Sequence, residues 1–392
     1  MKIELPNQVK KIIAVLEAHG HEAYAVGGCV RDTLMGRVPN DWDVTTSAKP
    51  QEVKALFPRT VDTGIQHGTV TVMFGKTGFE VTTYRIDGAY KDNRHPESVT
   101  YTERLSEDLL RRDFTINAMA YNETRGIQDL FGGQDDLKAH VIRAVGVPEE
   151  RFREDALRIL RCVRFAAQLD FSIDESTFRA AKALAGNLKD ISKERVREEF
   201  VKMLVSAHPE AVGTLCEIGA AFAIEPTLPA RLEETLPLLK RMPADEVFRL
   251  AAFLHSAADP DRVLRELKFD NKTRKAVDTM IAFSKEAVSE DPVILRHLLR
   301  TYGKEDFERL LVFYGLVREE DMGRTVKEAE RILNAQECVS LQELAVKGED
   351  LKQLGIPAGK RMGEVLNGLL EIVLNDPEMN EKEILFAKIS QL

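Results

Sequence analysis

The sequence has little of what several common classes of protein require. In its 392 residues, no apolar run approaches the roughly 18–20 residues that span a bilayer. The N-terminal stretch lacks both the uninterrupted apolar segment and the small-residue cleavage site of a signal peptide. We therefore expect a cytoplasmic protein without a membrane partner. The cysteines are few, far apart and without a CxxC pair, which predicts buried, reduced thiols and no zinc site: Cys29, Cys162, Cys216 and Cys338.

An excess of positive charge is also missing. The chain carries 55 Lys and Arg against 64 Asp and Glu, which gives a formal net charge of −9. This charge argues against a protein that coats nucleic acid by charge alone, but not against a partner held on a local basic surface. The 44% hydrophobic and 30% charged residues are typical of a globular chain. The length predicts two to four domains.

The hydrophobic pattern changes near residue 145. Before this point, short β-branched and aromatic runs alternate with glycine-containing turns, as at 69–74 and 79–86, which is typical of strands in a mixed α/β domain. From about residue 149 onward, the apolar spacing is helical almost without interruption. We therefore predict an α+β fold, in which a head with a mixed sheet and helices precedes an all-α remainder.

The stretch from residue 25 to residue 46 combines a glycine pair with two closely spaced carboxylates. Asp41 and Asp43 stand one residue apart before a strand-like segment, so both can project from one face and bind a divalent metal ion such as Mg²⁺. Gly27 and Gly28 let backbone N–H groups approach a phosphate, and Arg31 offers a planar fork to its oxygens. Alone, the two acids indicate a solvated turn, and the glycines an ordinary αβ turn. Together, the two features favour nucleotidyl transfer with two metal ions.

The segment EDALR (154–158) offers a way to read a base. Asp155 and Arg158 are three residues apart on a predicted helix, so they can lie on one face as an acceptor beside a donor. Cytosine and adenine present an amino donor beside a ring-nitrogen acceptor, whereas uracil and guanine present the opposite polarity. An Asp/Arg pair would therefore accept C and A and reject U and G. The alternative for the same spacing is an intrahelical ion pair.

Four motifs occur in an order that resembles one known family. They are GGCVRDTLMGRVPNDWDVTT, LRRDFTINAMAY, RFREDALRILRCVRFAAQL and ERVREEFVKML, and they lie between about residues 25 and 205. In this order they are similar to the motifs of class II (bacterial-type) tRNA nucleotidyltransferases and the related bacterial poly(A) polymerases, in the polymerase-β superfamily. The resemblance implies a polymerase-β-like head, Mg²⁺ as cofactor, and a protein template for CTP and ATP instead of a nucleic-acid template.

The resemblance also implies roles for particular residues. Asp41 and Asp43 would be the catalytic metal ligands. Glu80 is the candidate for a third acidic ligand on a neighbouring strand, with a plain strand-edge carboxylate as the alternative. Without the resemblance, Arg161 and Arg164 would be interpreted as a solvated helix face. The nucleotide would be bound by Gly28, Arg31, Arg112, Asp155, Arg158, Arg161 and Arg164.

Further expectations concern a turn and the division of the chain. Asp113 is expected to orient a turn, and Asn117 could reach the ribose. No His-Asp dipeptide occurs, so an appended HD phosphohydrolase is not indicated. The expected parts are a catalytic head (1–145), a helical neck for base recognition (146–205), a helical body (206–310) and a helical tail that binds tRNA (311–392).

Two local features bear on which activity the family resemblance implies. The segment GIQHGTVTV (64–72) is similar to that of the enzymes that act on tRNA, rather than to that of poly(A) polymerases. The polar connection at 87–110 has the composition of a flexible loop, with Asp87, Lys91 and Arg94 in it, and CC-adding enzymes carry a shortened loop there. Full CCA addition is therefore favoured, while addition of the final A alone and poly(A) synthesis stay open.

The expected partners are tRNA, CTP and ATP. A homodimer is compatible with the sequence but is not required by it. An alternative outside catalysis is a silent RNA-binding protein that retains the fold, because a fold alone does not establish an activity.

Overall fold

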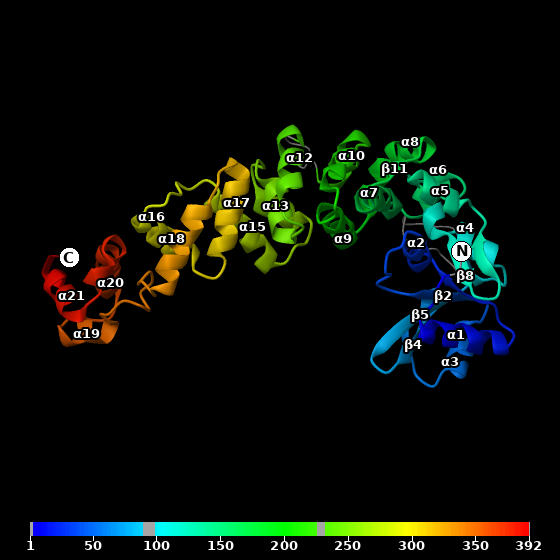
Figure 1. The fold of residues 1–392 in the computed structure, drawn as a ribbon, viewed down its shortest axis with the longest axis horizontal. Coiled ribbons are helices and arrows are strands. Elements are labelled where there is room, and N and C mark those ends of the chain that lie inside the picture. The colour runs from blue at the N-terminus through cyan, green and yellow to red at the C-terminus, as the bar shows by residue number, and fades with distance from the viewer. Residues whose placement is uncertain (1–2, 89–98, 226–231, 392) are drawn as a thin grey trace. The chain divides into compact units, whose positions relative to one another are not determined.

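The computed structural model has a sheet-containing head at the N-terminus followed by helices, as the α+β prediction stated (Figure 1). It describes residues 3–88, 99–225 and 232–391. The chain divides into two compact units, the first comprising Met1–Lys240 and Ser256–Phe269 and the second comprising Arg241–His255 and Asp270–Leu392.

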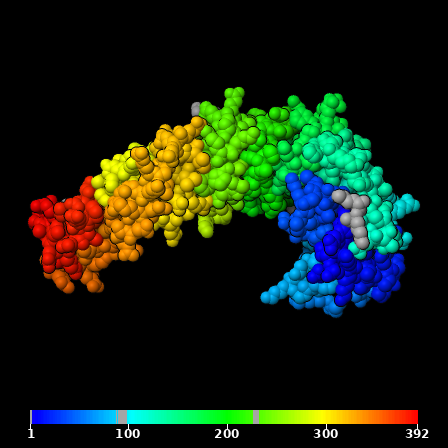
Figure 2. Space-filling view, viewed as in Figure 1, coloured from blue at the N-terminus to red at the C-terminus, as the bar shows by residue number. Residues whose placement is uncertain are grey.

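A seven-stranded mixed sheet forms the centre of the head. Its strand order is β3-β4-β5-β2-β1-β8-β9. The pair β2 and β5 is parallel and the other neighbours are antiparallel. The hairpin of β4 and β5 projects from the head as a light-blue ridge (Figure 2). The strands are β1 (Ala23–Val26), β2 (Asp43–Thr46), β3 (Thr60–Gly64), β4 (Thr69–Phe74), β5 (Thr77–Thr83), β8 (Met119–Asn122) and β9 (Gly126–Asp129).

The apolar run predicted as one strand at 79–86 is divided in the structure. It supplies the end of β5 and then β6 (Arg85–Asp87), with Tyr84 between them. The backbone N–H of Tyr84 donates to the carbonyl of Thr46 (2.7 Å), and its carbonyl accepts from the N–H of Thr102 (3.0 Å). The chain therefore leaves the main sheet at Tyr84, and β6 pairs instead with β7 (Val99–Tyr101).

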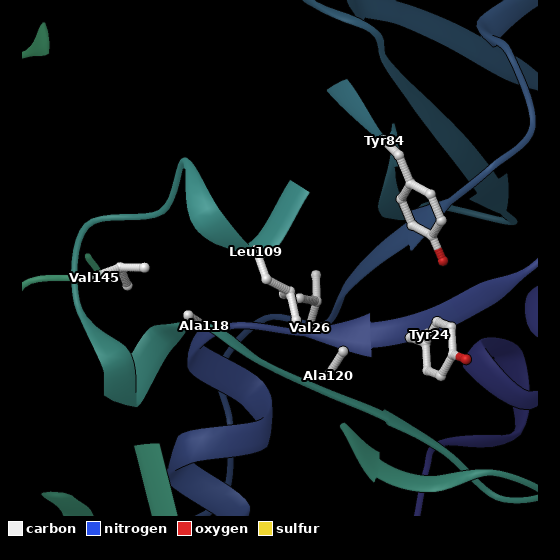
Figure 3. Close-up of a cluster of buried hydrophobic side chains, with 7 residues drawn as sticks. All are labelled: Tyr24, Val26, Tyr84, Leu109, Ala118, Ala120 and Val145. Carbon is white, nitrogen blue, oxygen red and sulfur yellow. The ribbon is translucent and has the colours of Figure 1, made fainter. Parts of the chain in front are cut away.

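Helices cover one face of the sheet, and a compact apolar cluster lies on another part of the head. α1 (Asn7–Ala18) and α3 (Pro50–Leu56) pack against the strands. The predicted apolar stripe of α1 is buried at Val9, Ile12, Ile13 and Leu16. Because side chains alternate along a strand, Tyr24 and Val26 of β1 share one side of the sheet. They join a buried cluster with Tyr84, Leu109, Ala118, Ala120 and Val145 (Figure 3).

The other helices of the first unit follow the sheet or connect its strands. α7 packs against α9, and this pair contributes side chains to the site described below. A two-residue parallel ladder joins β10 (Val141–Ile142) to β11 (Ser172–Ile173). The helices are α2 (Gly28–Leu34), α4 (Leu105–Leu110), α5 (Gly133–Ala139), α6 (Pro148–Glu154), α7 (Leu157–Leu169), α8 (Glu175–Leu184), α9 (Lys193–Leu204), α10 (Val212–Glu217), α11 (Ala220–Ile224), α12 (Leu232–Arg241), which ends at the unit boundary, and α14 (Pro260–Glu266).

The described residues of the second unit form helices joined by loops, without a strand. Phe283 meets the rings of Tyr302 and Phe307 edge to face, which forms part of its core. The buried Arg296 donates to the carbonyl of Leu374 (2.6 Å) and so ties two helices together. The helices are α13 (Glu246–Leu254), α15 (Asn271–Phe283), α16 (Pro292–Tyr302), α17 (Phe307–Arg318), α18 (Gly323–Asn334), α19 (Gly348–Gln353), α20 (Lys360–Asn375) and α21 (Lys382–Lys388).

The structure also describes the apolar segments and the cysteines of the chain. No helix among the described residues has both the length and the hydropathy needed to cross a bilayer. All four cysteines are free thiols. Cys29, Cys162 and Cys338 are buried, and Cys216 is half-buried.

Candidate active site

A tight turn joins β1 to α2 at the glycine pair. Gly27 has a φ of 82°, in the region that L side chains rarely adopt, and it precedes the first residue of α2, Gly28. A Cβ at position 27 would lie 3.2 Å from Nη1 of Arg112. Glycine is therefore required at position 27, both by the backbone conformation and by the closeness of the guanidinium.

The predicted metal-binding carboxylates lie beside this turn. Asp43 is the first residue of β2 and pairs in register with Val26, the last residue of β1. On the other side of β2, Val44 pairs with Val81 of β5. Glu80 therefore stands next to Asp43 on the neighbouring parallel strand, and Asp41 lies two residues before Asp43. The side chains of Asp41, Asp43 and Glu80 are all exposed to solvent.

The electrostatics of this group favour a cation. Partial loss of hydration is the main cause that raises the pKa of Asp43 to about 6, and repulsion from Glu80 and then Asp41 adds to it. Arg112 opposes the shift. In the described part of the chain, no three His, Cys, Asp or Glu side chains stand close enough to form a ready-made metal cluster. The three carboxylates nevertheless fit a divalent cation, because they are hard oxygen donors whose mutual repulsion a cation would relieve.

Arg112 connects the carboxylates to a second group of residues. Its Nη2 donates to Oδ2 of Asp108 (3.2 Å), and its buried Nε has no partner among the described residues. Arg111 also donates to Asp108, from Nη2 to Oδ1 at 2.7 Å. Burial alone would raise the pKa of Asp108, but Arg111 and Arg112 hold it below its usual range. Arg112 is thus positioned by a buried anion, with its Nη1 beside the Gly27 turn.

Asp155 does not lie on a helix, contrary to the prediction. α6 ends at Glu154 and α7 begins at Leu157, and Asp155 is extended between them, with φ −141° and ψ 104°. Its Oδ1 accepts from the N–H of Leu157 (3.1 Å), a cap-like bond that an aspartate makes readily at a helix start. Its carboxylate also accepts from Arg195 of α9 through both oxygens, at 3.3 and 2.7 Å.

Arg158, on α7, has partners of its own. Its Nη1 donates to Glu154 and to the carbonyl of Arg151 (3.1 Å), and its Nη2 donates to the carbonyl of Arg111 (2.7 Å). The structure therefore does not form the intrahelical Asp155–Arg158 ion pair that the spacing allowed. Both side chains instead line one open pocket of about 260 Å³, together with Arg111, Arg112, Asp113, Leu157, Arg161 and Arg195.

Asp113 and Arg161 form the wall of this pocket. Oδ2 of Asp113 accepts from Nε (2.8 Å) and Nη2 (2.6 Å) of Arg161. Its Oδ1 accepts from the N–H of Phe114, as expected for a residue that orients a turn, and from Nδ2 of Asn117. Burial alone would raise the pKa of Asp113, but Arg161 and Asn117 hold it well below its usual range. Asn117 is further bonded through its Oδ1 to Arg31 (2.6 Å), so it is part of a buried protein network.

Two predicted nucleotide-binding arginines lie away from the lining of the pocket. Arg31 is buried, pairs with Asp32 and Asn117, and lies over the ring of Phe165. Arg164 is also buried rather than on a solvated face, and it pairs with Glu199 while stacking 3.8 Å from the centre of the same ring. Arg31 thus connects α2 of the head to α7, whereas the partners of Arg164 lie on α7 and α9.

The predicted site residues therefore fall into three sets. Gly28, Asp41, Asp43 and Glu80 gather around the start of β2, and Arg112, Asp155, Arg158 and Arg161 line the pocket, with Arg112 close to both sets. Arg31 and Arg164 lie outside these two sets. Of the residues assigned to a flexible loop, Asp87 is the last residue of β6, and Lys91 and Arg94 lie outside the described residues. Sequence reasoning missed Arg195, although the motif that contains it was recognised.

Family models and curated relatives of one kind match this chain. Residues 23–143 match the family model described as the Poly A polymerase head domain, and residues 247–389 match the model for domain 2 of tRNA nucleotidyltransferases. The CCA-adding enzyme of Lactobacillus helveticus is 37% identical, over 95% of this chain and 94% of that protein. The CCA-adding enzyme of Enterococcus faecalis is 38% identical, over 98% of this chain and 97% of that protein.

Solved structures give the same result. The crystal structure of the Bacillus stearothermophilus CCA-adding enzyme in complex with CTP is 34% identical and superposes with a TM-score of 0.85, over 99% of this chain and 98% of that chain. The Thermotoga maritima CCA-adding enzyme complexed with tRNA, at 23% identity and a TM-score of 0.66 over 98% and 95% of the two chains, shares the fold. The head and its site define a nucleotidyltransferase. The chain belongs to the family of CCA-adding enzymes, which generally use a divalent metal ion.

Proposed function

We propose that this enzyme adds CCA to the 3′ end of tRNA from CTP and ATP, without a nucleic-acid template. The observation that carries the proposal is the position of Arg112. Its guanidinium lowers the pKa of Asp43, approaches the Gly27 turn and lines the pocket that holds Asp155 and Arg158. One arginine thus adjoins a carboxylate group suited to a cation and a pocket suited to a base, which is the arrangement that a bound nucleoside triphosphate needs.

In this proposal, Asp41 and Asp43 hold the divalent cation, Mg²⁺, and Glu80 is a candidate third ligand. When bound, the cation would lower the pKa of the attacking 3′ hydroxyl and stabilise the leaving pyrophosphate. Arg112 would contact the triphosphate through its Nη1, which lies beside the Gly27 turn. The backbone of the Gly27–Gly28 turn can approach the phosphates because no Cβ stands in the way.

Asp155 and Arg158 would select the base. Three of the roughly four acceptor positions of the Asp155 carboxylate are used by Leu157 and Arg195. Arg158 makes three hydrogen bonds, to Glu154 and two carbonyls, and a guanidinium has about five N–H donors. An acceptor and donors therefore remain for the amino group and the adjacent ring nitrogen of cytosine or adenine. Uracil and guanine would set a carbonyl oxygen against the carboxylate.

We further propose that the parts of the chain divide the work. Residues 1–145 would hold the metal and triphosphate, residues 146–205 would read the base, and residues 206–310 and 311–392 would form a body and a tail that bind tRNA. The nucleotide-binding roles that the resemblance implies for Arg31 and Arg164 would then be indirect, because protein partners already occupy both guanidinium groups.

The test uses tRNA transcripts that end before the CCA, after the first C and after CC, each incubated with Mg²⁺ and one or all of the four nucleotides. We expect C, then C, then A, with no addition of U or G, as read by sequencing the products. Long A tails would identify a poly(A) polymerase instead, and addition of A only to the transcript ending in CC would identify an A-adding enzyme. Binding of tRNA without any incorporation would identify a silent RNA-binding protein.

The metal assignment has its own test. Asp41→Ala and Asp43→Ala should each abolish incorporation and leave tRNA binding unchanged, because they remove ligands without altering the helical parts. Asp62→Ala, at an exposed aspartate of the same sheet that pairs with Lys54, is the matched control and should retain activity. Turnover that survives in both Asp41→Ala and Asp43→Ala would show that the assignment is wrong.

A further inference from the structure

Arg195 is the residue that fixes the orientation of Asp155. It lies in the first turn of α9, forty residues along the chain from Asp155, and it lines the same pocket. Its Nη1 and Nη2 reach Oδ1 and Oδ2 of the Asp155 carboxylate at 3.3 and 2.7 Å. Within the described part of the chain, no other acceptor bonds to its guanidinium. This bidentate contact fixes the orientation of the carboxylate plane, which a single hydrogen bond cannot do.

The remaining bond to Asp155 is local and holds only one oxygen. The N–H of Leu157 donates to Oδ1 at 3.1 Å, whereas Oδ2 accepts from Arg195 alone. The acceptor position still available to a ligand is therefore on Oδ2, the oxygen that Arg195 positions. Asp155 and Arg195 are both partly buried, so their contact is not screened as an exposed surface pair would be.

We propose that Arg195 is a third specificity-determining residue, which positions Asp155 so that Oδ2 meets the amino group of cytosine or adenine. The inference rests on the proposed function of Asp155 and Arg158. With Arg195 in place, a uracil or guanine oxygen faces a fixed carboxylate and is repelled. Without it, the carboxylate can rotate about the bond to Leu157 and turn away from that oxygen. The penalty against U and G then falls more than the affinity for C and A.

The experiment measures kcat/KM for CTP and for UTP on a tRNA transcript that lacks CCA. Arg195→Gln should lower the CTP/UTP ratio by about tenfold or more, the discrimination expected from one well-placed polar contact. Arg195→Lys keeps the charge but not the fork, so it should recover part of the ratio. Arg179→Gln removes an exposed arginine of the same helical region that pairs with Glu175, and it should leave the ratio unchanged.

An unchanged CTP/UTP ratio in Arg195→Gln would overturn the proposal, even if that variant is slower or melts earlier. Should Arg195→Gln fail to fold, Arg195→Lys carries the same test, and a wild-type ratio in it would be equally decisive against the proposal. Combination with Asp155→Asn adds a second readout. Because Arg195 acts through Asp155, the double variant should discriminate no worse than Asp155→Asn alone, whereas additive losses would contradict that route.

These measurements also distinguish a failure of the proposed role of Arg195 from a failure of the proposed base reading by Asp155 and Arg158. If Asp155→Asn loses selection for C and A while Arg195→Gln keeps it, the role of Arg195 is wrong and the proposed base reading stands. If Asp155→Asn itself retains wild-type selection, the proposed base reading fails, and the role of Arg195 fails with it.

Discussion

Replacing Asp43 by asparagine should stabilise the metal-free protein at neutral pH while it abolishes catalysis. The folded protein raises the pKa of Asp43 from 3.8 to about 6, mainly through lost hydration and then through Glu80. A difference of this size corresponds to roughly 3 kcal/mol at full strength. Because the Asp43 side chain is exposed, solvent screening reduces this to about 1 kcal/mol. The asparagine side chain has nearly the same shape as aspartate but no charge, so the variant avoids this cost.

The pH dependence of the effect has a definite sign. Above pH 6, Asp43 is ionised in both the folded and the unfolded chain, and the folded chain bears the full penalty. Between pH 6 and 3.8, protonation of the folded form removes the penalty, and below 3.8 the residue is neutral in both states. The stabilisation by Asp43→Asn should therefore be largest above pH 6 and vanish near pH 4.

The assay is thermal unfolding in EDTA at pH 7.5 and at pH 4. A gain of about 1 kcal/mol should raise the Tm of a unit of this size by about 2–4 °C at pH 7.5. Added Mg²⁺ should raise the Tm of the wild type more than that of Asp43→Asn. Asp62→Asn is the control and should lower the Tm slightly, because Asp62 pairs with Lys54 at 2.9 Å. A Tm of Asp43→Asn at or below the wild-type value at pH 7.5 would refute the reasoning.

Two further predictions concern the turn and the buried network. Gly27→Ala should cost about 1–2 kcal/mol of stability in urea unfolding, because the φ of Gly27 is 82°, and it should also lower kcat/KM by displacing Arg112. Gly20→Ala is the control: Gly20 has a φ of 85° but no neighbour within 4 Å, so this variant should lose similar stability and keep its activity. Glu199→Gln should cost about 3 kcal/mol in the same measurement, because it leaves the buried Arg164 without its anion, whereas Glu175→Gln at an exposed pair should change stability by less than about 0.5 kcal/mol.

The parts of the fold that follow from local pattern were predictable. The run at 69–74 is β4, and the apolar stripe of α1 is buried as its spacing indicated. In both cases the deciding physics, side-chain alternation and helical period, acts within a few residues of the chain. The family resemblance, rather than local pattern, implied an acidic residue on a strand next to the DxD, and the pairing of β2 with β5 puts Glu80 beside Asp43.

The partners of the charged residues were not predictable from spacing. Asp155 was expected on the same helix as Arg158, but a helix start at Leu157 separates them, and the partner of Asp155 is forty residues away in α9. A signal was present, since an aspartate just before an apolar helical run is a common helix cap. Arg164 was expected to lie on a solvated helix face or to bind the nucleotide, but it is buried and pairs with Glu199 of α9. Ion pairs of this kind depend on how helices pack, which a single sequence does not specify.

The net charge of −9 does not describe the surroundings of the pocket. Five arginines and two aspartates line the pocket that contains Asp155 and Arg158, so arginine donors dominate its lining in an acidic chain. At physiological salt a charge acts over about 8 Å, so distant surface acids contribute little to the potential that a triphosphate meets there. Buried or partly buried carboxylates such as Asp108 and Glu154 hold the arginines in fixed directions. The pocket therefore presents oriented donors without a large excess of positive charge, and we expect this combination to favour selective nucleotide binding over the indiscriminate binding of RNA that a uniformly basic surface would give.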